Sequence, residues 1–198
     1  MPDIRVEKTF KDISSIELFQ RFCQALRNSK LPENYREGAP WTELLRRILR
    51  EIGTSLGYRV SDLDFGIEWL TIDQTWRIHE STLVRTYLAM EEENTYDVED
   101  VIDDEVEKLL DIKSNVKLLI YYPDKSVQSL HLSMLQEAID IGPLLPDERF
   151  VVIMIDSDAT SEDDYGKYTK LTVQGYELAK KMQFKEVGAE EIPRKVSA

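Results

Sequence analysis

Three consecutive glutamates, Glu91-Glu92-Glu93, end a run of alternating apolar residues and are the segment best suited to chemistry. On a strand, Glu91 and Glu93 project to the same face, about 7 Å apart. Like charges at this distance raise each other's pKa unless a cation lies between them. Mg²⁺ and Mn²⁺ bind carboxylate oxygens, and such an ion activates water and polarises a phosphate. The pair therefore predicts a metal site for hydrolysis. The alternative is a solvated strand end beside an acidic helix.

Glu68 is the candidate third ligand, because it lies inside another apolar run and a half-buried carboxylate needs a partner or a metal. The alternative is an edge-strand carboxylate paired across the sheet with Arg77 or Arg85. Asp64 and Asp73, at the two ends of the same run, are weaker candidates for this role.

The densest basic patch is formed by Arg46, Arg47 and Arg50. These residues are predicted to contact phosphate groups of DNA, since guanidinium groups bind phosphate in a bidentate way. The alternative is a set of intrahelical ion pairs with Glu43 and Glu51 at helical spacing.

Composition limits the remaining function classes. The formal net charge of −13 argues against a long basic surface for nucleic acid. The single cysteine, Cys23, excludes an intramolecular disulfide framework and a multi-cysteine zinc site, and His79 and His131 are the only imidazoles. No apolar run reaches the length of a membrane span, and no signal peptide precedes the first charged residues. These features predict a cytoplasmic protein without a membrane partner.

Apolar spacing predicts the elements that must position these groups. Period-3.6 stripes indicate helices, and period-2 or continuous apolar runs indicate strands. The last ten residues are expected to be frayed. The expected helices are 12–28, 41–56, 97–113, 126–141 and 168–182, and the expected strands are 65–73, 75–80, 83–92, 116–122 and 150–155.

This order of elements predicts an α/β (α+β) fold in three layers. A mixed central sheet, built from a three-strand meander plus βαβ units, carries helices on both faces. We expect one domain over 1–198. Its core spans about 41–156, residues 1–40 form an N-terminal helix and loop, and 157–198 form a C-terminal extension.

Over roughly 41–156, the arrangement resembles the restriction-endonuclease-like, PD-(D/E)XK nuclease superfamily. That core has a helix, a three-strand meander, a helix and a further strand, with an acid on the second strand and a glutamate-containing pair on the third. The resemblance places Glu68 at the first acid and Glu91 with Glu93 at the pair. Glu93 stands where the family usually has lysine, so the lysine role moves to Lys108 or Lys113 on the next helix.

The resemblance implies a Mg²⁺- or Mn²⁺-dependent phosphodiesterase acting on DNA. In it, Glu68 and Glu91 hold the metal, and Glu93 or Lys108 orients the attacking water. Glu51, on the first core helix, matches a glutamate that sometimes joins the site in this superfamily. A non-catalytic module whose acidic face binds a basic protein or a metal is one alternative, and a structural subunit of a homodimer or larger homo-oligomer is another.

Overall fold

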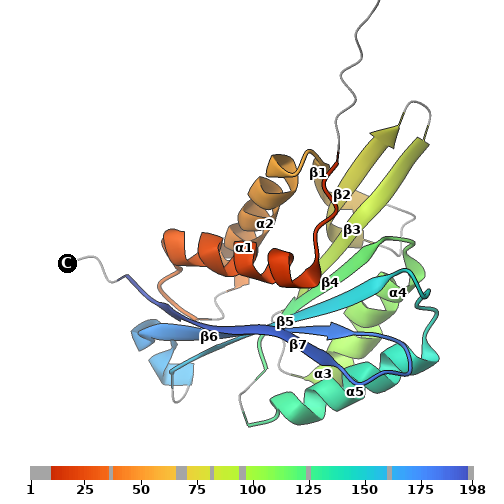
Figure 1. Ribbon diagram of the computed structural model, residues 1–198. Coiled ribbons are helices and arrows are strands. Elements are labelled where there is room, and N and C mark those ends of the chain that lie inside the picture. Colours follow the sequence, from red (N-terminus) through yellow and green to blue (C-terminus); the bar gives the residue numbers. More distant parts are fainter. Residues whose placement is uncertain are drawn as a thin grey trace, which may run out of the picture.

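The computed structural model describes residues 10–35, 38–65, 71–80, 83–93, 97–123, 126–159 and 162–195. A mixed sheet of seven strands runs through the centre, and Figure 1 shows helices on both of its sides. The elements in chain order are α1 (Ser15–Asn28), α2 (Gly38–Ser55), β1 (Arg59–Phe65), β2 (Thr71–Glu80), β3 (Leu83–Glu93), α3 (Val98–Asp100), the π-helical turn η1 (Val101–Val106), α4 (Glu107–Asp111), β4 (Val116–Tyr121), α5 (Gln128–Ile141), β5 (Arg149–Ser157), the 3₁₀ turn η2 (Glu162–Lys167), β6 (Lys170–Leu178) and β7 (Lys185–Pro193).

The strands lie in the sheet in the order in which they occur in the chain. β1, β2 and β3 form the antiparallel meander that the sequence predicted, and β3, β4 and β5 are parallel. Helical segments connect the parallel strands, as βαβ units require. β6 and β7 then extend the sheet in antiparallel pairing. The mixed sheet, the meander and the βαβ units are therefore confirmed.

Two hydrophobic cores occupy the two faces of the sheet. The larger one buries α1 and α2 against alternate residues of the central strands, such as Leu88, Leu118 and Ile153. The other buries α3, α4 and α5 against the intervening residues, such as Ala89 and Leu119. Because side chains alternate across a strand, the continuous apolar runs of β4 and β5 supply both cores at once. This arrangement confirms the three layers.

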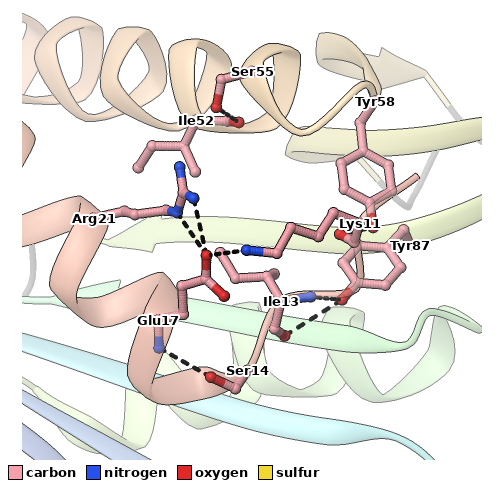
Figure 2. A network of polar contacts seen from close by, with 9 residues as sticks. All are labelled: Lys11, Ile13, Ser14, Glu17, Arg21, Ile52, Ser55, Tyr58 and Tyr87. Carbon is pink, nitrogen blue, oxygen red and sulfur yellow. Dashed lines mark hydrogen bonds and ion pairs between the residues drawn. The ribbon is translucent and has the colours of Figure 1, made fainter. Parts of the chain in front are cut away.

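Two stacked tyrosines hold the segment that enters α1 against the sheet. The rings of Tyr58 and Tyr87 lie 4.5 Å apart between centroids. The Tyr58 hydroxyl donates to the carbonyl oxygen of Lys11 over 3.0 Å, and the backbone N–H of Ile13 donates to the Tyr87 hydroxyl over 2.9 Å (Figure 2). The direction in which the chain enters α1 is thus set by residues more than forty positions away.

Ser14 begins α1 as a helix cap. Its hydroxyl accepts a hydrogen bond from the backbone N–H of Glu17 over 3.1 Å. The Glu17 carboxylate binds Lys11 and Arg21 (Figure 2). These ion pairs, led by the hydrogen bonds from Lys11 and Arg21, lower the pKa of Glu17.

Two facing glycines let α1 lie close to the last two strands. Gly175 of β6 pairs with Gly188 of β7, and the ring of Phe19 covers both. A Cβ at either glycine would overlap that ring. The missing side chains therefore determine how closely α1 packs on the sheet.

The strand predicted over 65–73 is wrong. β1 ends at Phe65 and β2 begins at Thr71, so the first two strands of the meander are 59–65 and 71–80. The apolar residues between them misled the prediction, because they continue the alternation of β1.

The C-terminal prediction is also wrong. A strand, β6, replaces the helix expected over 168–182, and the tail expected to be frayed begins with the second half of β7. The sequence of β6 does carry a strand signal, since buried residues alternate from Leu171 to Val173 among β-branched neighbours. Pairing with β5 makes 170–193 a continuation of the central sheet.

Among the helices in the described part of the chain, none is long and apolar enough to cross a bilayer.

Candidate functional site

Glu91 lies at the carboxyl end of β3 and faces the side of the sheet covered by α3, η1 and α4. Only 3% of its surface is exposed. Its Oε1 has no hydrogen-bond partner among the described residues. A buried carboxylate with a partnerless oxygen is costly unless it is protonated or binds a cation. This observation singles out Glu91 from the other glutamates of β3.

The acid next to Glu91 is Asp73 of β2. Gln74, the residue after Asp73, pairs with Met90, the residue before Glu91, and the charge of Asp73 acts on the carboxyl group of Glu91. Its Oδ2 accepts a hydrogen bond from the backbone N–H of Glu92 over 3.0 Å, which ties it to the end of β3.

A third carboxyl group reaches the site from η1. Glu105 is buried and shares a hydrogen bond with Glu91. The ammonium of Lys108 donates to both carboxylate oxygens of Glu105, over 3.0 and 3.1 Å. Glu105 therefore lies between Glu91 and Lys108. We call these three residues the carboxylate cluster; it joins β3 to η1 and α4.

Burial first, and then the negative charges of Glu105 and Asp73, raise the pKa of Glu91 to about 10. At neutral pH, Glu91 is therefore protonated and donates to Glu105. For Lys108, burial opposes the charged form, but the hydrogen bond to Glu105 and the charges of Glu105 and Glu91 outweigh it and raise the pKa of the ammonium. In the absence of a metal ion, the negative charge of Glu91 and Glu105 is neutralised by the proton that they share and by the ammonium of Lys108.

The wide helical turn η1 places Glu105 toward the sheet. It runs over Val101–Val106, and the backbone N–H of Glu107 bonds to the carbonyl of Ile102, five residues earlier. Such turns are rare and occur frequently at functional sites. Here the turn buries Val101, Glu105 and Val106 together, so a carboxyl group shares the apolar face of the helix.

Glu92 points to the opposite face and has a different role. The hydroxyl of Thr42 donates to its Oε2 over 2.6 Å, and that of Tyr122 donates to its Oε1 over 2.9 Å. Burial raises the pKa of Glu92, although these two hydrogen bonds lower it. With both oxygens bound, Glu92 ties the end of β3 to α2 and β4.

The structure brings together only part of the predicted site. Glu91 and Lys108 belong to one cluster, as expected. Glu93 ends β3, partly exposed and opposite Tyr121 of β4. Glu68 lies outside the described residues, so its position as a ligand is untested. Among the described residues, the acid whose charge acts on Glu91 from β2 is Asp73, which the sequence ranked lower.

Sequence reasoning missed Glu105. It is one of ten carboxylates from Glu91 to Glu107, and such an acidic run by itself indicates the solvated face of a helix. The available signal was its spacing of four residues from Val101 and Leu109, both of which are apolar and buried.

The basic patch on α2 contacts the sheet. Arg46 pairs with Asp73, and Arg50 pairs with Asp62 of β1. Arg47 is exposed. At two of its three arginines, this patch thus forms ion pairs with β1 and β2, which neither the predicted phosphate contact nor the alternative of intrahelical pairs had included.

The carboxylates at the end of β3 suit a weakly bound hard cation that keeps several waters better than a site in which protein groups supply every ligand. Among the described residues, no three His, Cys, Asp or Glu side chains are grouped so that they could hold a metal ion. Within the described part of the chain, Glu91 nevertheless has a buried oxygen without a hydrogen-bond partner, and the charge of Asp73 acts on the same carboxyl group. Mg²⁺ is often bound through one or two carboxylates and several waters.

Comparisons of this chain with protein-family models and with curated proteins found no match.

Proposed function

We propose that this protein is a Mg²⁺- or Mn²⁺-dependent phosphodiesterase that cleaves DNA, with its site at the carboxyl end of β3. The observation that carries the proposal is the buried Glu91, which has one partnerless oxygen and lies beside Asp73, Glu105 and Lys108. A protein gains no stability from such a cluster in an apolar core, so a functional reason for it is expected.

The order of the elements supports the same proposal. A helix, an antiparallel meander, a helical crossover and a parallel strand follow one another in α2, β1 to β3, α3 to α4, and β4. This is the order implied by the resemblance to restriction-endonuclease-like nucleases. In our proposal the acid of the second strand is Asp73, and Glu91 with Glu93 forms the pair of the third.

Glu91 and Asp73 would hold the metal ion, with waters completing its coordination. When bound, a divalent ion lowers the pKa of its water and polarises a phosphate oxygen. Arg46 and the N–H of Glu92 fix the orientation of Asp73. Lys108 holds Glu105 against Glu91, and its ammonium is the group that would orient a water or a phosphate oxygen.

The decisive experiment compares Glu91→Gln with Glu99→Gln, an exposed glutamate on α3 that serves as the matched control. The wild-type protein and the control should show a rise in melting temperature with Mg²⁺ or Mn²⁺, and Glu91→Gln should not. Cleavage of plasmid and single-stranded DNA should be lost in Glu91→Gln alone. If the folded Glu91→Gln variant keeps both the metal response and cleavage, the site assignment is wrong.

A second candidate is a non-catalytic module that binds a basic protein. Two observations favour it: the net charge is −13, and two arginines of the predicted DNA patch, Arg46 and Arg50, are already paired with Asp73 and Asp62. Exposed acidic residues of α3, η1 and α4 would form the contact surface. They are Glu99, Asp100, Asp103, Asp104 and Glu107. A folded wild-type protein with neither metal response nor cleavage would favour this module.

A further inference from the structure

A groove lies at the opposite edge of the sheet, where β3, β4 and β5 begin. Two hollows form it, of about 450 and 320 Å³. Arg85, Asn115 and Asp147 line both, so the hollows are continuous. Arg85 and Glu91 are six residues apart on β3, which corresponds to roughly 20 Å. The groove is therefore separate from the carboxylate cluster.

Two cations converge on this groove without a described partner. Arg85 and Lys113 both line the larger hollow, and both are exposed. Neither forms an ion pair or side-chain hydrogen bond with the described part of the chain. Arg149, which lines the smaller hollow, differs from them because it binds Asp12, the carbonyl of Ile13 and the Tyr87 hydroxyl.

The acidic groups of the groove are largely engaged. Glu148 accepts hydrogen bonds from the backbone N–H groups of Ser114 and Leu145 and pairs with the buried Lys117 over 3.3 Å. Asp12 pairs with Arg149. Among the described residues that line the groove, only Asp147 opposes Arg85 and Lys113, which leaves 2 − 1 = +1 uncommitted charge in a chain whose net charge is −13.

The lining of the groove suits an oxyanion. A guanidinium donates two parallel hydrogen bonds to a phosphate, and an ammonium adds a third donor. Beside them, Thr86 and Asn115 contribute a hydroxyl and an amide. We propose that this groove binds a phosphate group through Arg85 and Lys113. The phosphate belongs either to a small phosphorylated molecule or to the backbone of a nucleic acid.

The test is calorimetric titration with pyrophosphate, mononucleotide and a short DNA duplex. The double variant Arg85→Gln/Lys113→Gln is compared with Lys185→Gln/Lys195→Gln, which removes the same charge from exposed lysines at and just beyond β7. We expect at least tenfold weaker pyrophosphate binding in the first variant and less than a twofold change in the second. Equal weakening in both, or no saturable binding by the wild-type protein, would overturn the proposal.

The ligand source follows from the relative affinities. Tighter binding of pyrophosphate or mononucleotide than of duplex identifies a small phosphorylated ligand. Tighter binding of the duplex, with a steeper dependence on salt and with competition by pyrophosphate, identifies a nucleic-acid backbone. Glu91→Gln should leave binding unchanged in either case, so this groove can be confirmed even if the proposed nuclease activity is absent.

Discussion

Replacing Glu91 with glutamine should change the pH dependence of stability more than stability itself. The amide imitates the protonated carboxyl group and can still donate to Glu105. In the wild-type protein, burial and the neighbouring carboxylates raise the folded-state pKa of Glu91 from 4.5 to about 10. The folded protein thus holds this proton more tightly than the unfolded chain does. Its contribution is fully present below pH 4.5 and is lost as the pH rises toward the folded-state pKa.

The magnitude follows from linkage. Through Glu91, each pH unit within this window removes about 1.4 kcal/mol from the wild-type free energy of unfolding, and this contribution is absent in Glu91→Gln. Between pH 5 and pH 8, the variant should therefore gain roughly 4 kcal/mol relative to the wild-type protein. In a protein of this size, that corresponds to a relative gain of about 8–16 °C in melting temperature.

The assay is urea denaturation of both proteins at pH 5, 6, 7 and 8 in a chelating buffer, with Glu99→Gln as the exposed control. Stability curves for the wild-type protein and Glu91→Gln that stay parallel over this range would refute the reasoning. They would mean that the cluster is solvated or that its charge is compensated differently. Addition of Mg²⁺ at pH 8 should recover part of the lost stability in the wild-type protein and in Glu99→Gln but not in Glu91→Gln, because a bound cation replaces the proton of Glu91.

Three further predictions concern the framework that holds both sites, and each is measured by urea denaturation. Gly188→Ala should destabilise the protein by about 1–3 kcal/mol because its Cβ overlaps the ring of Phe19. The loss should be smaller in a Phe19→Leu background, and strictly additive losses of stability in the double variant would contradict the contact. Lys117→Met should lower stability by about 3–5 kcal/mol because it leaves Glu148 without its buried cation, and a neutral result would show that backbone N–H groups alone suffice. Ser14→Ala should lower stability by about 1 kcal/mol through loss of the α1 cap, whereas Ser14→Asp should preserve it.

The local pattern of the chain was enough to predict most elements. α1, α2, β3, β4, α5 and β5 each have a strong period of their own, so a prediction from neighbouring residues identifies them. The order of these elements then implied the meander, the parallel strands and the layers. Glu91 was also identifiable, because three carboxylates at the end of an apolar strand contrast with the residues before them.

β1 and β6 show where local pattern fails. Between Phe65 and Thr71, the apolar residues Ile67 and Trp69 continue the alternation of the strand, and this pattern outweighed the single glycine, Gly66, that follows Phe65. In β6, a central glycine interrupts the strand signal, and its role becomes visible only when Phe19 of α1 lies over it. Both errors arise because pairing partners distant in the chain decide the assignment.

The sequence by itself determined the fold class, the acidic character of the chain and the importance of Glu91, because these depend on composition and short-range periodicity. Lys108 was predicted too, but only the tertiary structure decided which acids accompany Glu91. The packing of β2 on β3 brought the charge of Asp73 to Glu91, and the π-helical turn η1 placed Glu105 between Glu91 and Lys108. The same applies to the groove formed by Arg85 and Lys113, which are 28 positions apart in the chain. Charge interactions act across space, and only the packed sheet and helices determine which charges meet.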